Sequence, residues 1–340
     1  MKSGIKEQLV IDGQIEFGLL SSPVRDINFL DAKIFPGKYT PRWFKNIRLK
    51  EFQAFQAGNE DFFIFLTLFN AKVSAFAQVR IFDIRTKKHY IYEKQLLPGA
   101  LKIPNGILNS TNNYDGKNLS IHIENQFQDE FVKVKFSAPA TKELPSVEGE
   151  IIGNFEACDS MVVSIPFAEN RGMYAHKGIT SMKGHLTIAN EDYSFDEKES
   201  FFILDDHKGY YPYRMEWDWL TTAFIQGEKL IGINLTRNQS LDNEKHNENG
   251  VWIDGKLTKL PGVHFTRDGD TWSIKDQKET IDLVFTCQYP KNVRLNLGPL
   301  GASDYQSPMG VVSGTIQLNQ ETTIKLESVF SIAEKQYLRC

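Results

Sequence analysis

The sequence predicts an all-β protein whose strands form up-and-down antiparallel barrels. Aromatic residues, which favour strands, are abundant: the chain holds 24 phenylalanines, 12 tyrosines and 5 tryptophans. Alternating apolar and polar runs follow one another after residue 46 and are separated by short turns, whereas helical periodicity over ten or more residues is hard to find. We therefore expect fewer than about one residue in five to be helical, against a usual share near one third.

The first half of the chain contains a series of strand patterns. Residues 61–68 are almost entirely apolar, as in a strand buried on both faces, and residues 74–85 alternate cleanly. Strands are expected at residues 61–68, 74–85, 89–94, 119–124 and 131–137. Residues 137–154 are rich in proline and small polar residues, so the domain boundary is expected near their end.

The second half repeats this pattern. Strands are expected at residues 185–195, 219–235, 251–260, 263–275, 280–288 and 322–338. Asp254-Gly255 and Asp268-Gly269 lie between alternating runs, where an Asp-Gly pair predicts a hairpin. Because 340 residues exceed one ordinary core, we expect two barrel domains, residues 1–155 and 156–340, with the candidate site in the second.

Composition and charge exclude several classes of protein. The formal net charge is −4 and no block of basic residues stands out, which argues against nucleic acid and anionic membranes as main partners. The most apolar region, residues 62–79, is interrupted by polar side chains and is not an integral membrane segment. Cys158, Cys287 and Cys340 lie far apart, which is typical of free thiols, and no signal peptide is seen. We expect a cytoplasmic protein.

Motifs for cofactors and metals are not found. The chain has no glycine-rich dinucleotide fingerprint, no phosphate-binding loop and no Cys/His grouping with zinc-ligand spacing. We therefore expect no cofactor and no structural metal.

Residues 201–219, FFILDDHKGYYPYRMEWDW, combine acids, bases and aromatic residues more densely than any other window. The group DDHKG is expected on a turn. Strand alternation after it places Glu216 and Asp218 on one face and Trp217 and Trp219 on the other. Neighbouring carboxyl groups in different environments can divide into an acid and a base, and His207 titrates near neutrality. The alternative is a charged strand face in solvent. The candidate catalytic residues are Asp206, His207, Glu216 and Asp218.

Other polar residues could complete such a site. His176 lies in a glycine-rich stretch expected to be a loop, although a lone loop histidine is more often structural. Asn234 points away from its apolar strand neighbours and needs a hydrogen-bond partner, and the NENG sequence at 247–250 is by itself an ordinary turn. The candidate substrate-binding residues are His176, Asp205, Lys208, Tyr211, Tyr213, Arg214, Trp217, Trp219, Asn234, Glu248 and Asn249.

Several blocks of this sequence resemble the domain of unknown function family 2804. They are WFKNIRLKEFQAF (43–55), HKG (176–178), DDHKGYYPYRMEWDW (205–219), GINL (232–235), NENGVWIDGKL (247–257) and GVVSG (310–314). The His-Gly turn followed by W-x-W is more distantly similar to the double-lipocalin group of carotenoid hydratases, survival-factor-like and tocopherol-cyclase-like proteins. This resemblance implies two tandem lipocalin-like antiparallel β-barrels. The turn His207-Lys208-Gly209 is one residue shorter than in the hydratases and lacks their tryptophan.

These observations lead to one main functional hypothesis and two alternatives. The first is an enzyme, a lyase of the hydratase type or an isomerase or cyclase, that acts on a hydrophobic or amphipathic small molecule by acid–base chemistry. The alternatives are a lipid or pigment carrier and a carbohydrate-active enzyme that uses Glu216 and Asp218. We expect His207, Glu216 and at least one of Asp205, Asp206 and Asp218 to line one pocket, with His176 approaching it. The sequence does not determine the substrate or the oligomeric state.

Overall fold

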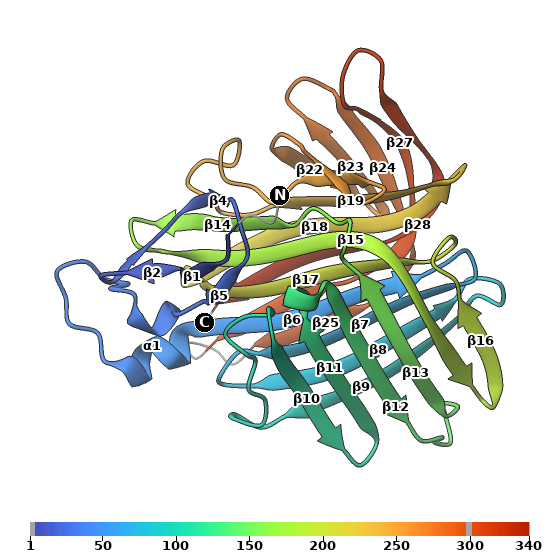
Figure 1. Ribbon diagram of the computed structural model, residues 1–340, viewed down its shortest axis with the longest axis horizontal. Helices are drawn as coiled ribbons and strands as arrows, with labels where there is room; N and C mark the ends of the chain where they lie inside the picture. Colours follow the sequence, from blue (N-terminus) through green and yellow to red (C-terminus); the bar gives the residue numbers. More distant parts are fainter. Residues whose placement is uncertain (1–3, 297–300, 340) are drawn as a thin grey trace.

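The computed structural model describes residues 4–296 and 301–339, in which the chain is almost entirely β-structure. The helical elements of this part are α1 (Arg42–Arg48) and two 3-10 turns, η1 (Phe29–Asp31) and η2 (Phe127–Asp129). The predicted all-β class and low helix content are confirmed. Two large antiparallel sheets, each curled into a half-barrel, pack against each other (Figure 1). No helix in the described ranges is long and apolar enough to span a membrane.

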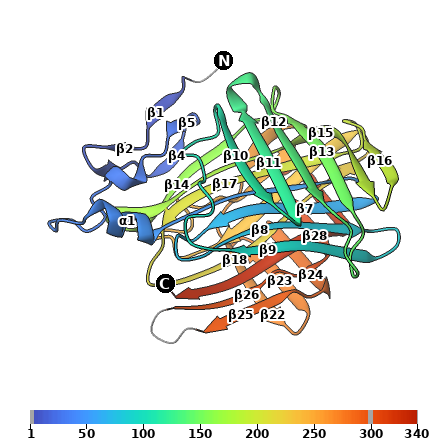
Figure 2. The ribbon, with the colours of Figure 1, turned by 90° about the horizontal axis from the view of Figure 1, so that it is seen from below.

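The N-terminal segment forms short strands on the outside of the first sheet. They are β1 (Lys6–Gln8), β2 (Val10–Ile11), β3 (Gln14–Ile15), β4 (Gly18–Leu20) and β5 (Val24–Asp26). Apolar side chains of this segment, including Leu9 and Phe29, are buried against Tyr174 and Tyr210 of the sheet. This contact ties the segment to the body, and Figure 2 shows it beside α1 at one end of the molecule.

The first sheet takes its strands from the first 210 residues. Besides β4, which pairs with β14, they are β6 (Leu49–Gly58), β7 (Phe62–Asn70), β8 (Ala75–Asp83), β9 (Lys88–Leu96), β10 (Ser110–Gly116), β11 (Leu119–Gln126), β12 (Phe131–Ala138), β13 (Val147–Asn154), β14 (Met161–Ala168), β15 (Arg171–Ile188), β16 (Glu191–Phe195) and β17 (Phe201–Tyr210). The main order is β10-β11-β12-β13-β15-β17-β6-β7-β8-β9. Strands β15 and β17 therefore join two meanders that are consecutive in sequence.

The second sheet contains the strands that follow. They are β18 (Arg214–Gln226), β19 (Lys229–Arg237), β20 (Gly250–Ile253), β21 (Lys256–Lys259), β22 (Val263–Asp268), β23 (Thr271–Asp276), β24 (Ile281–Tyr289), β25 (Asn292–Asn296), β26 (Ala302–Gln306), β27 (Met309–Gln317) and β28 (Thr323–Arg339). The main order is β21-β20-β19-β18-β28-β27-β24-β23-β22. Both predicted Asp-Gly turns join hairpins, and Gly255 and Gly269 adopt positive φ angles of 77° and 57° there.

The chain passes from one sheet to the other between β17 and β18. The expected boundary at residues 155/156 instead falls inside the first sheet, between β13 and β14. The proline-rich stretch 137–154 is the turn of the β12–β13 hairpin followed by β13 itself. Residues 161–210 therefore contribute strands to the first sheet, because hydrogen bonding and not local composition determines which sheet a strand joins.

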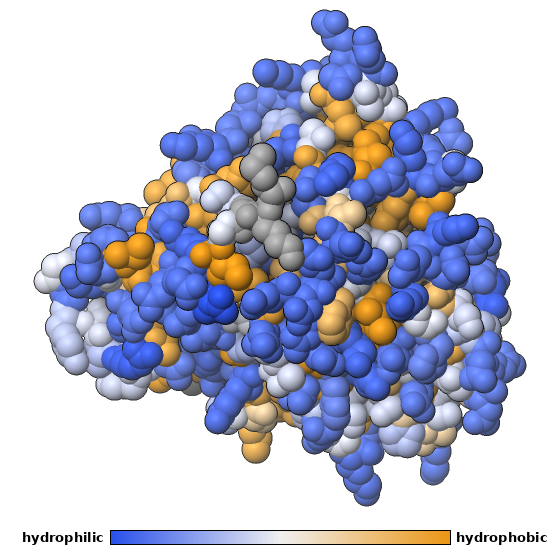
Figure 3. Space-filling view, in the orientation of Figure 1, coloured by the Kyte–Doolittle hydropathy of each residue, from blue (hydrophilic) through white to orange (hydrophobic). Residues whose placement is uncertain are grey.

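Three apolar clusters account for the packing of the sheets. One fills the concave side of the first sheet and includes Phe202 and Leu204, and a second fills the concave side of the second sheet. The third lies between the sheets and includes Phe201, Ile203 and Trp219. Strand β17 thus buries both faces, and each large apolar side chain so buried contributes roughly 1.5–3 kcal/mol. The face of the molecule shown in Figure 3 is mostly hydrophilic, with apolar residues in small separate groups.

Candidate functional site

Strand β17 carries the polar residues expected on a turn, and they are all buried. Asp205, Asp206, His207 and Lys208 lie within a regular strand paired on both sides, so the turn expected for DDHKG was wrong. Alternation sends Asp205 and His207 toward the second sheet, together with Ile203. Asp206 and Lys208 point into the concave side of the first sheet. These neighbouring residues therefore belong to two separate polar clusters.

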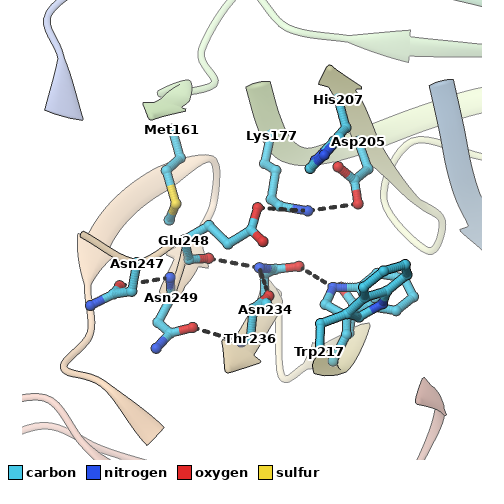
Figure 4. Close-up of polar contacts among 12 residues, drawn as sticks. Met161, Lys177, Asp205, His207, Trp217, Asn234, Thr236, Asn247, Glu248 and Asn249 are labelled. Carbon is cyan, nitrogen blue, oxygen red and sulfur yellow. Dashed lines mark hydrogen bonds and ion pairs between the residues drawn. The ribbon is translucent and has the colours of Figure 1, made fainter. Parts of the chain in front are cut away.

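The cluster between the sheets is centred on Lys177 of β15 (Figure 4). Lys177 lies directly opposite Asp205 in the strand register, and its Nζ is 2.6 Å from Oδ2 of Asp205. The same Nζ is 3.4 Å from Oε2 of Glu248, which comes from the segment before β20 of the second sheet. All three side chains are less than 8 % exposed. An ion pair thus links the two sheets.

The charges of this cluster do not balance if every group is ionised. Burial acts to lower the pKa of Lys177, but Asp205 and Glu248 outweigh it and raise that pKa, so the ammonium is kept. Burial raises the pKa of Asp205, Lys177 opposes this, and the charge of Glu248 raises the pKa further. Two buried carboxyl groups facing one ammonium therefore favour retention of a proton.

His207 forms a neutral pair with Tyr211. The two side chains are joined by a 2.7 Å hydrogen bond between the tyrosine hydroxyl and Nε2, and the imidazole stacks on Phe52 at 4.5 Å. Burial, followed by the charges of Lys177 and Lys208, holds the pKa of His207 well below its usual range. The imidazole is therefore uncharged at neutral pH.

Asn234 and Asn249 fix the segment that presents Glu248. Asn234 accepts a 2.7 Å hydrogen bond from the indole N–H of Trp219 and donates a 2.7 Å bond to the backbone oxygen of Glu248. Asn249 accepts a 2.6 Å hydrogen bond from the backbone N–H of Thr236. The hydrogen-bond partner required by the inward Asn234 is therefore present, and both asparagines position the site.

A further acid, the half-buried Glu334 of β28, lies on the same face. Its carboxylate accepts a 3.2 Å hydrogen bond from the indole N–H of Trp217 and another from the hydroxyl of Tyr305. Burial raises the pKa of Glu334 to about 7, although both hydrogen bonds act in the opposite direction. The ring of Trp217 lies 5.9 Å from that of Tyr211, which connects Glu334 to the His207 pair.

A hollow of about 710 Å³ lies in the second half of the chain and shares Trp217 with the residues just described. It is lined by Glu216, Trp217, Asp218, Arg237, His264, Phe265, Thr266, Arg267, Asp304, Gln306, Lys335, Gln336 and Tyr337. As alternation predicts, the side chains of Glu216 and Asp218 lie on the opposite face of β18 from those of Trp217 and Trp219. Asp218 is bound by Arg237 at 3.4 Å and by Arg267.

The remaining candidates lie elsewhere. Tyr213 is exposed on the turn between the sheets, and Arg214 is exposed at the start of β18. His176 lies on β15 rather than on a loop, opposite Asp206, and contacts Ser160 at 3.0 Å and the ring of Phe127. Burial lowers the pKa of His176 to about 3. It therefore belongs with Asp206 to the concave side of the first sheet, not with His207.

Asp206 and Lys208 form the second polar cluster. Lys208 Nζ lies 3.6 Å from Oε1 of Glu51, which is also bound by Lys72. Neither carboxylate oxygen of Asp206 has a hydrogen-bond partner within the described residues. Burial raises the pKa of Asp206 to about 7, against the opposing charge of Lys208.

Sequence reasoning missed Lys177 and Glu334. Lys177 is the residue after His176. If this stretch had been predicted as a strand, alternation would have placed Lys177 on the opposite face from His176. Glu334 was included in an expected strand, but nothing in its local pattern marked it as inward-facing. Among the described residues, no three His, Cys, Asp or Glu side chains form a group that could hold a metal ion.

Comparison with known proteins identifies the family. The domain of unknown function family DUF2804 matches residues 5–340. The chain belongs to this family. No curated protein matches it.

Two solved structures are similar to this chain over most of its length. Kievitone hydratase from Nectria haematococca is 12% identical, with a TM-score of 0.47, over 95% of this chain and 97% of that one. A putative AttH from Nitrosomonas europaea is 12% identical, with a TM-score of 0.45, over 89% of this chain and 98% of that one.

Proposed function

We propose that this protein is an enzyme that acts on a hydrophobic or amphipathic small molecule by acid–base chemistry. The observation that carries the proposal is Glu334, a half-buried carboxyl group whose pKa is raised to about 7 and which accepts a hydrogen bond from Trp217, one of the residues that line the hollow. A general acid works best when its pKa lies near the working pH. Glu334 meets this condition, and the exposed Glu216 and the separately buried Asp206 are less well placed for the role.

The contacts around Glu334 suggest how the reaction would proceed. The carboxyl group of Glu334 gives its proton to a carbon of a substrate double bond, and a cation forms on the neighbouring carbon. The face of Trp217 stabilises that cation. Water then bonds to the cation and returns one proton to Glu334, which completes a hydration. Loss of a neighbouring C–H proton to Glu334 instead would shift the double bond.

His207 and Tyr211 have a positioning role in this scheme. Their 2.7 Å hydrogen bond and the stacking on Phe52 fix a hydroxyl group beside Trp217. That hydroxyl is suited to orienting the attacking water. Lys177 holds the two carboxyl groups of Asp205 and Glu248 in place.

The test begins with native mass spectrometry of the protein purified from its own host, which identifies the bound molecule. Extracted ligand is then incubated with the enzyme, and products are sought that differ by the mass of water or are isomers. Glu334→Gln should bind the ligand and abolish turnover, because glutamine still accepts a hydrogen bond from Trp217 but has no acidic proton. Glu327→Gln, on the exposed part of β28, is the matched control and should retain activity.

The pH dependence provides an independent test. The acid form of Glu334 disappears as the pH rises through about 7, so turnover should fall above this value. A carrier would instead return its ligand unchanged with both wild type and Glu334→Gln, and this result would contradict the enzymatic proposal. The carbohydrate alternative requires carboxyl groups facing each other across a cleft, whereas Glu216 and Asp218 lie side by side on β18.

A further inference from the structure

A short segment near the N-terminus concentrates positive charge. Residues 32–50 contain six lysines and arginines and no aspartate or glutamate, although the whole chain has a net charge of −4. Lys33, Lys38 and Arg42 are exposed. Arg42 pairs with Asp31 at 2.8 Å, but both partners are solvent-exposed, so this pair contributes little and is readily exchanged. The overall charge argues against an anionic partner, whereas the local charge favours one.

The same segment presents large apolar side chains to solvent. Trp43 and Ile47 are 65 % and 43 % exposed and lie four residues apart on α1, so they share one face. Tyr39, just before the helix, is 92 % exposed. No residue of α1 is buried. The helix thus places its apolar face toward solvent, the reverse of the usual arrangement in a globular protein.

Contacts on the opposite side hold the helix in this orientation. The ring of Phe44 lies 6.4 Å from that of Phe35, and a guanidinium N–H of Arg48 donates a 3.0 Å hydrogen bond to the backbone oxygen of Tyr211. A seven-residue helix is not stable alone, so these contacts fix which face points outward. Figures 1 and 2 show α1 and the loop before it at one extremity of the molecule. A flat surface can therefore reach them.

We propose that this basic-aromatic surface, formed by Lys33, Lys38, Tyr39, Arg42, Trp43 and Ile47, docks the protein on an anionic phospholipid bilayer. Tryptophan and tyrosine are favoured at the membrane–water interface, and lysine and arginine beside them are attracted to anionic headgroups. The small apolar area and the few charges give weak, reversible binding that decreases with salt. This inference is independent of the proposed reaction.

The experiment is co-sedimentation of the full chain with vesicles of phosphatidylcholine, with and without phosphatidylglycerol, at low and high salt. Binding is expected only with phosphatidylglycerol and should weaken with salt. The variant Trp43→Ser/Ile47→Ser should bind at least about tenfold more weakly, and so should Lys33→Glu/Lys38→Glu. The controls Leu241→Ser/Val284→Ser and Lys94→Glu/Lys102→Glu change exposed residues elsewhere and should bind like wild type.

Tryptophan fluorescence gives a second measurement. Trp43 is the most exposed tryptophan, so its emission should shift to the blue with anionic vesicles, and this shift should vanish in Trp43→Phe. Absence of sedimentation with anionic vesicles, or an equal loss in the control variants, would overturn the proposal. So would self-association through Trp43 without vesicle binding, detected by sedimentation equilibrium, because the surface would then join two copies of the chain.

Discussion

The two faces of β17 bury the same kinds of side chain in different ways. On the face between the sheets, Asp205 is bound at 2.6 Å by Lys177, which also reaches Glu248. On the concave face of the first sheet, Asp206 has no hydrogen-bond partner in the described part of the chain, and Lys208 lies 3.6 Å from Glu51. The comparison shows that a buried carboxyl group either keeps its charge by means of a close cation or keeps its proton.

The largest effect is expected from Lys177→Met. This change leaves Asp205 and Glu248 buried without a cation, which costs about 3–5 kcal/mol in the free energy of unfolding at neutral pH. Urea denaturation measures the loss. Lys275→Met, which removes the exposed pair with Asp282, is the control and should cost less than about 1 kcal/mol. Equal losses for the two variants would show that the pair between the sheets is no more than a surface ion pair.

The next effect concerns pH and Asp206. Its pKa in the folded protein, about 7, lies above the ordinary value of 3.8, so the folded state binds the extra proton between these values. Stability contributed by this proton is complete below about pH 4 and is lost as the pH rises to about 7, by up to roughly 1.4 kcal/mol per pH unit. Asp206→Asn removes this loss and should gain stability relative to wild type as the pH rises.

Chemical denaturation of wild type and Asp206→Asn at pH 4 to 8 measures this gain. Asp282→Asn at an exposed position is the control and should follow wild type. Parallel stability curves for wild type and Asp206→Asn would mean that Asp206 is ionised in the folded state.

A smaller loss, about 1–2 kcal/mol, is expected for Lys208→Met. Glu51 still has Lys72 as a partner after this change, and Asp206 can remain protonated. The same urea experiment should therefore rank Lys208→Met clearly below Lys177→Met. If Lys208→Met were the more damaging variant, the distinction between the two faces would be incorrect.

The smallest effect is spectroscopic. The indole N–H of Trp217 donates to Glu334, so ionisation of that carboxyl group changes the charge beside the ring. The fluorescence of Trp217 should titrate with a midpoint of about 7. Glu334→Gln should abolish this titration, whereas Glu327→Gln should leave it intact. If the fluorescence titration persisted in Glu334→Gln, it would arise from another ionisable group.

Where a strand could be recognised, the alternation of apolar and polar residues was sufficient to predict its position and the faces of its side chains. It predicted the strands at 61–68 and 322–338, the Asp-Gly hairpins, and the division of Glu216 and Asp218 from Trp217 and Trp219. It failed for Asp205 to Lys208, because four consecutive polar residues are costly to bury and ordinarily mark a turn. The partners that make burial possible are Lys177, Glu51 and Glu248, which lie far away in sequence.

The sequence by itself determined the all-β class and most strand positions, because both follow from local alternation and turn chemistry. Which strands share a sheet, and therefore where the sheets divide, was decided only by long-range pairing. Glu334 shows this clearly. The pairing of β28 with β27 contains a register shift near Ser328, whose φ is 54°. Before this shift the even-numbered residue Leu326 faces the concave side of the second sheet. After it the even-numbered residue Ile332 faces the first sheet. This shift brings Glu334 to Trp217, and no local pattern records it.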